Sequence, residues 1–143
     1  MRQSGQDTDY YGNEKKVSIN FGKVKRHFQS IIILDMSNLI QIEEIDQREI
    51  IPGFLARFVH SEHLTISYWE IKKGSRLPEH QHHHEQISQV MDGKFELTIN
   101  GIANVMTPGK VAVIPSNAMH AGVALTDCKV MDIFCPVRED YKS

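Results

Sequence analysis

Apolar and polar residues alternate in short runs from about residue 38 to the C-terminus, which is the pattern of β-strands that each bury one face. Residues that favour turns separate these runs, and no long helical period is present. The expected strands cover residues 54–59, 64–71, 86–92, 95–99, 102–106, 110–114, 120–125 and 129–134. Short strands at regular spacing predict an all-β domain, either a sandwich or a barrel.

The turns between these strands have recognisable sequences. Asp92-Gly93 and Asn100-Gly101 are dipeptides favoured in tight hairpins, because both central residues of such a turn need positive φ. Pro108-Gly109 and residues 115–117 mark two further turns. Residues 40–48 have an ambiguous period and are the one place where a short helix is expected.

The first 35 residues differ from the rest, because residues 1–16 are polar and offer little to bury. Residues 17–21 alternate in polarity and predict one short strand. Two interpretations stay open: an extension upstream of a true start at Met36, or an arm that crosses to a partner subunit. The expected organisation is therefore an N-terminal arm (1–35) and one β-barrel domain (36–143).

Composition narrows the class of protein. The net charge is −2 over 143 residues, which gives no reason to expect nucleic acid or an anionic membrane as partner. No apolar run approaches the roughly 20 residues that cross a bilayer, so we expect a cytoplasmic protein. Cys128 and Cys135 are an odd number of residues apart, so on one strand they would point to opposite faces and stay free thiols.

Half of the eight histidines lie between residues 80 and 84. In a strand His80 and His82 would share a face, and Gln86 would join them if the chain bends between. His120 returns after three strands, so the four side chains can surround one divalent transition metal (Zn, Ni, Fe, Mn or Co). His84 has the same parity and can replace one of these ligands or touch a substrate. A solvated polar loop is the alternative.

The order and spacing of these residues resemble the two motifs of the cupin family. The first is Gly74-x5-His80-x-His82-x3-Gln86-x6-Gly93. The second is Gly109-x5-Pro115-x4-His120. The resemblance implies a jelly-roll barrel (a double-stranded β-helix) with the metal on His80, His82, Gln86 and His120, in which Gln86 stands where cupins usually have Glu. It also implies a homodimer that exchanges N-terminal strands.

The C-terminal segment adds three candidate residues. Asp132 and Phe134 share parity and can both face the cavity beside His120. An Asp in such a cavity can act as general acid or base. The planar fork of Arg138 suits a carboxylate. The alternatives are a satisfied polar group in a strand for Asp132 and a surface ion pair for Arg138.

This tail, together with Gln at the fourth ligand position, is similar to pectin-degradation cupins of the KdgF type. That resemblance implies an enzyme that converts 4,5-unsaturated uronate sugars to linear ketouronates. Asp132 would then move the proton, Phe134 would pack against the sugar, and Arg138 would bind its carboxylate. Another metal cupin enzyme, such as an iron dioxygenase, and a non-enzymatic cupin that binds a small molecule are the alternatives.

Overall fold

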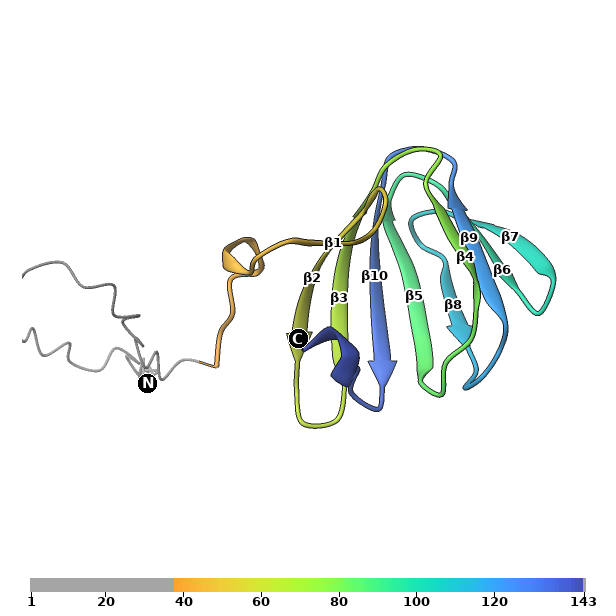
Figure 1. Cartoon of the computed structure of the whole chain (residues 1–143). Coiled ribbons are helices and arrows are strands. Elements are labelled where there is room, and N and C mark those ends of the chain that lie inside the picture. Colours follow the sequence, from red (N-terminus) through yellow and green to blue (C-terminus); the bar gives the residue numbers. More distant parts are fainter. Residues whose placement is uncertain (1–37, 143) are drawn as a thin grey trace, which may run out of the picture. The chain divides into compact units, whose positions relative to one another are not determined.

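The computed structural model describes residues 38–142, which form two antiparallel β-sheets (Figure 1). The larger sheet has the order β1-β2-β3-β10-β5-β8, with bounds Arg48–Ile51, Phe54–His60, Thr65–Ile71, Cys128–Cys135, Glu85–Asp92 and Val111–Ile114. The smaller sheet has the order β4-β9-β6-β7, with bounds Arg76–His80, His120–Ala124, Phe95–Ile99 and Ile102–Met106. Two 3₁₀ turns, η1 (Ile42–Glu44) and η2 (Glu139–Tyr141), complete the elements. Within residues 38–142 no helix has the length and apolar character needed to span a bilayer. The prediction of an all-β fold is confirmed.

All eight strands expected between residues 54 and 134 are present, each within one residue of its expected bounds. Two strands were missed, β1 and β4. Both lie at sheet edges, where charged residues and proline are tolerated, and β4 contains Pro78. Of the helix expected in residues 40–48 only η1 forms. The expected strand at residues 17–21 and the arm at 1–35 lie outside the described residues.

The two Gly-containing turns differ from one another. Asn100 (φ 48°) and Gly101 (φ 80°) both have positive φ and join the paired strands β6 and β7 in a hairpin, as predicted. At Asp92-Gly93 only Gly93 has positive φ (80°). The hairpin predicted there is wrong, because β5 and β6 belong to different sheets and this turn carries the chain from one sheet to the other.

Gly93 is expected to tolerate no side chain. A Cβ atom there would lie 2.3 Å from the Asp127 carbonyl oxygen and 2.7 Å from Thr126 Oγ1. Gly101 is a matched control, since it has φ of +80° and nothing within 4 Å of a Cβ atom. We expect Gly93→Ala to lower the free energy of unfolding by about 1–3 kcal/mol more than Gly101→Ala does. Urea unfolding of both variants measures this, and equal losses would show that strain from positive φ alone explains the effect.

The inner face of the larger sheet changes character along its length. Across β3, β10 and β5 one register row is apolar (Trp69, Val130 and Val90), and the next row is polar (Ser67, Asp132 and Ser88). All six side chains are buried. The apolar rows pack against Phe54, Phe95 and Leu97 to form the core. The buried polar row therefore marks the end of the barrel where a functional site is expected.

A candidate metal centre beside a small cavity

Three histidines come together where the two sheets meet. His80 ends β4 and pairs in register with His120, which begins β9. His82 lies in the loop between β4 and β5. One ring nitrogen from each histidine lies within 4.8 Å of the other two. The side chains thus converge from the end of β4, the loop after it and the start of β9. Strand parity predicted His82 beside His80, but residues 81–84 form a loop.

Backbone carbonyls fix the orientation of all three rings. The Nδ1 atoms of His80, His82 and His120 lie 2.8, 3.2 and 2.9 Å from the carbonyl oxygens of Pro78, His84 and Ala118. A carbonyl only accepts, so each Nδ1 carries a proton, and Nε2 is the atom of each ring that can bind a metal. The Nε2 atoms of His82 and His120 are buried without a hydrogen-bond partner. Buried acceptors that converge in this way fit a metal ion, which would satisfy all of them.

The charge state of these histidines also fits metal binding. Burial, followed by the charges of Arg138 and the neighbouring histidines, lowers the pKa of His82 to about 4. Burial likewise lowers the pKa of His120. Both imidazoles are therefore neutral near pH 7, which is the form that coordinates a metal.

A cavity of about 160 Å³ opens beside the histidines. Sites for drug-sized ligands have volumes of roughly 300–1,000 Å³. This cavity is smaller, so it favours a ligand smaller than those. Its polar lining includes Gln86, Ser88, His120 and Asp132, from both sheets. Apolar side chains cover the remaining wall, among them Ile50, Ile51, Phe54, Trp69, Leu77, Phe95, Phe134 and Tyr141.

Asp132 is the buried carboxyl group of this cavity. Its side chain lies in the polar row, flanked in register by Ser67 and Ser88. Burial raises its pKa to about 6, although Ser88, Gln86 and Trp69 favour the charged form. Oδ1 of Asp132 and Nε1 of Trp69 nevertheless make no hydrogen bond of good geometry. A buried carboxylate with an unsatisfied oxygen is costly for folding and is typical of functional sites.

Comparisons with known proteins agree with this geometry. Residues 67–134 match the family model described as "Cupin domain". The chain is 32% identical over 83 residues to the "Pectin degradation protein KdgF" of Dickeya dadantii (strain 3937), covering 57% of this chain and 76% of that protein. The solved structure of KdgF from Halomonas sp. superposes with a TM-score of 0.69 at 31% identity, covering 73% of this chain and 98% of that one.

The chain belongs to the cupin family. An RmlC-like cupin from Shewanella frigidimarina NCIMB 400 is also similar, with a TM-score of 0.70 and 26% identity over 73% of this chain and 96% of that one. These similarities confirm the predicted cupin barrel and the expected likeness to pectin-degradation cupins.

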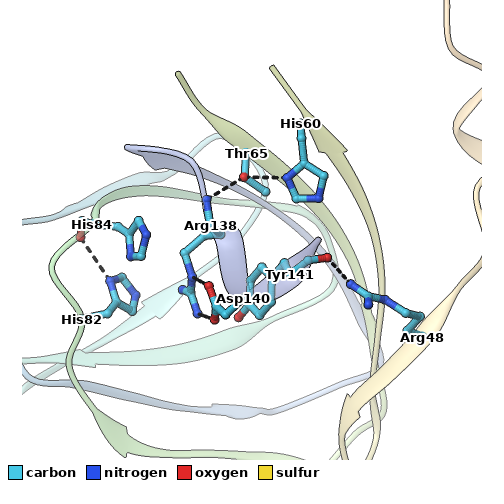
Figure 2. A network of polar contacts seen from close by, with 8 residues as sticks. All are labelled: Arg48, His60, Thr65, His82, His84, Arg138, Asp140 and Tyr141. Carbon is cyan, nitrogen blue, oxygen red and sulfur yellow. Dashed lines mark hydrogen bonds and ion pairs between the residues drawn. The ribbon is translucent and has the colours of Figure 1, made fainter. Parts of the chain in front are cut away.

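Of the two open arrangements, the geometry of this cupin brings His80 and His82, and not His84, together with His120. Among the described residues, the group able to hold a metal consists of His80, His82 and His120. The buried His84 ring lies outside it, 5.3 Å from the His82 ring and 6.4 Å from the Phe134 ring. Its carbonyl oxygen accepts the hydrogen bond from His82 (Figure 2), so its backbone orients a ligand.

Gln86 lies on β5 of the larger sheet, beside Asp132, whereas His80 and His120 lie on strands of the smaller sheet. It begins the inner face of β5 and pairs in register with Phe134 on β10. The side chain is buried and lines the cavity next to His120. Since β4 ends at His80 and β5 begins at Glu85, Gln86 approaches from the other sheet, as the expected bend requires.

Arg138 already holds a carboxylate of this chain. The residue is buried, at 9% exposure. Its Nε and Nη2 atoms donate to Oδ1 and Oδ2 of Asp140 at 2.9 and 2.7 Å. Pairing with Asp140 raises the pKa of Arg138 in spite of its burial, so the charge is retained. The alternative of an ion pair for Arg138 is therefore present in the structure. The Arg138 side chain of this pair is mostly buried, whereas that of Asp140 is exposed.

Several residues around the cavity were missed in the sequence. Ser88 follows Gln86 by two positions, so alternation alone would have placed it on the inner face. Trp69, an aromatic residue in a strand, could either line the cavity or pack the barrel, and it does both. Tyr141 also lines the cavity, and its place in the wall depends on how residues 135–142 fold back. No local sequence signal gives that path.

The remaining predictions for single residues are mostly confirmed. Cys128 is buried, Cys135 is exposed, and both are free. Of the histidines outside the two motifs, which should lie at the surface, His63 is exposed. His60 is instead half-buried, stacks on Phe58 and bonds to Thr65 Oγ1 at 2.9 Å. His27 lies outside the described residues.

Proposed function

We propose that this cupin is a metal-dependent enzyme that opens the ring of 4,5-unsaturated uronate monosaccharides to give linear ketouronates. The observation that carries the proposal is one small cavity lined by Gln86, His120, Asp132 and Phe134. The guanidinium of Arg138 stacks against Phe134, with its carbon 4.9 Å from the ring centroid. The similarity to pectin-degradation proteins supports a sugar acid as the substrate.

His80, His82 and His120 would hold the metal, with Gln86 as a fourth ligand. All four donors are neutral, so they leave the full charge of a divalent ion in place. When bound, the ion supplies a Lewis acid that polarises an oxygen atom of the substrate. Zn, Ni, Fe, Mn and Co are all compatible with imidazole and amide donors.

Ring opening of this substrate is an isomerisation, so its atoms balance without a co-reactant. The C1 hydroxyl loses its proton, and the bond between C1 and the ring oxygen breaks to leave an aldehyde. C5 becomes a ketone as C4 takes up a proton. A single carboxyl group beside the ring can transfer these protons, and we assign this role to Asp132, the carboxyl group that lines the cavity.

Arg138 would bind the carboxylate of the sugar. Its charge is close enough to lower the pKa of His82 and His84, so the guanidinium lies near the place where the metal would be held. Phe134 offers a ring face against which the sugar can pack, and His84 lies at the edge of the same region.

The test uses the unsaturated galacturonate monosaccharide and its methyl ester as a matched neutral control. Turnover is followed by loss of the ultraviolet absorption of the C4=C5 double bond. We expect kcat/KM for the ester to fall on the order of 10- to 100-fold, because a charge-assisted hydrogen bond is lost. Chelation should stop both reactions. Failure of the metal-loaded protein to convert the acid would contradict the proposal.

A further inference from the structure

The guanidinium of Arg138 is held by a carboxylate that comes from the solvent side. Asp140 accepts its two hydrogen bonds from Nε and Nη2, at 2.9 and 2.7 Å. The Asp140 side chain is 57% exposed and that of Arg138 only 11%. Figure 2 shows the pair beside His82 and His84. Asp140 thus binds the edge of the guanidinium formed by Nε and Nη2.

Two aromatic rings of the cavity wall contact the guanidinium of Arg138. The guanidinium carbon lies 4.1 Å from the Tyr141 ring centroid and 4.9 Å from that of Phe134. Both rings line the cavity. With Asp140 along one edge and two aromatic rings packed against it, the guanidinium has little freedom to move.

The C-terminal segment that carries these residues is itself anchored to the large sheet. The Arg138 backbone N–H donates to Thr65 Oγ1 on β3 at 2.9 Å. Arg48 on β1 donates from Nη2 to the Tyr141 carbonyl oxygen (Figure 2). Asp140 lies between these two anchors, so its own position is defined by the fold rather than by the ion pair alone.

We propose that Asp140 is a positioning residue, which fixes the Arg138 guanidinium beside the histidine cluster in the orientation that receives the substrate carboxylate. The inference rests on the proposed function, because it assumes an anionic substrate at Arg138. An arginine fixed in advance loses less freedom when it binds, and binding is correspondingly tighter. Without Asp140 the long side chain would turn toward solvent.

The kinetic test replaces Asp140 with asparagine, which keeps the shape but removes the charge. Glu139→Gln is the matched control, since Glu139 is exposed and pairs with Lys142 instead. With the unsaturated galacturonate we expect Asp140→Asn to raise KM about tenfold while kcat changes less than about threefold. Metal content and Tm should match the wild type. An unchanged KM, or a loss confined to kcat, would overturn the proposal.

A double-mutant cycle separates positioning from an independent role. In an Arg138→Ala background, Asp140→Asn should change kcat/KM by less than about twofold, because the guanidinium that it positions is absent. Effects that multiply would mean that Asp140 acts by another route, and the positioning role would be lost.

One readout does not depend on the substrate at all. In ¹⁵N-labelled protein the Nε–H resonance of Arg138, assigned by its loss in Arg138→Ala, should be sharp and slow to exchange in the wild type. In Asp140→Asn it should broaden or vanish, and in Glu139→Gln it should persist. If the uronate is not converted but this pattern appears, the proposed substrate is wrong and the positioning of Arg138 by Asp140 stands. A resonance unaffected by Asp140→Asn would overturn the positioning role.

Discussion

Replacing His82 with alanine is expected to abolish metal binding and activity together. The Nε2 atom of His82 is buried without a partner, and its ring nitrogen lies within 4.8 Å of those of His80 and His120. Removing one imidazole leaves two, which hold a divalent ion far less tightly. The affinity should fall by more than the roughly 10- to 100-fold that loss of an outer hydrogen-bond partner costs. Elemental mass spectrometry of untagged protein measures the bound metal directly.

His83→Ala is the control for this experiment. His83 is adjacent in sequence, exposed and outside the group of three ligands. We expect the wild type and His83→Ala to retain about one equivalent of the same metal, and His82→Ala to retain almost none. Stoichiometric metal in His82→Ala would show that the ion is bound elsewhere. Absence of metal in all three proteins, after Zn, Ni, Fe and Mn have been supplied, would exclude the metal centre.

Alternation and turn chemistry predicted most of the barrel, because each central strand buries one face. Strand β10 is typical: Cys128, Val130, Asp132 and Phe134 are buried, and the intervening residues are more exposed. The edge strand β4 escaped detection because Pro78 and its charged neighbours give no alternation, and its pairing with β9 is irregular. Which strands share a sheet could not be predicted either, since Asp92-Gly93 has the sequence of a hairpin turn but joins the two sheets.

The histidine centre could be predicted from motif spacing, whereas the environment of the other site residues could not. Spacing placed His80, His82 and His120 together, but only the register of β4 with β9 explains why two of them meet. The fork of Arg138 was predicted to suit a carboxylate, and the carboxylate that it holds is that of Asp140, two residues away. A local contact of this kind depends on the backbone path of η2, which no sequence pattern specifies.

Asp132→Asn is expected to abolish ring opening while the metal is retained. The amide nearly matches the carboxyl group in shape, so it should keep its place in the polar row between Ser67 and Ser88. It cannot accept the proton that the reaction has to move. We expect kcat to fall by about 10²- to 10⁴-fold, the usual contribution of general acid–base catalysis. A variant with metal bound and a nearly normal rate would exclude Asp132 as the proton-transfer group.

The same substitution should stabilise the metal-free protein. Burial raises the pKa of Asp132 from 3.8 to about 6, so the folded state binds this proton more tightly than the unfolded state does. The contribution of Asp132 to stability is therefore most favourable below pH 4, and it is lost as the pH rises from about 4 through 6. A shift of about two pKa units corresponds to roughly 2–3 kcal/mol at neutral pH. Asparagine carries no charge and avoids this loss.

Urea unfolding of the metal-free proteins at pH 4 and pH 7 tests the sign. Asp132→Asn should unfold at nearly the wild-type urea concentration at pH 4 and at a clearly higher one at pH 7. Asp92→Asn, which changes an exposed carboxylate at the end of β5, should follow the wild type at both values. If Asp132→Asn is no more stable than the wild type at pH 7, the buried carboxyl group does not lower the free energy of unfolding. A stabilised but inactive variant would instead show that Asp132 is needed for the reaction, although it lowers the stability of the folded protein.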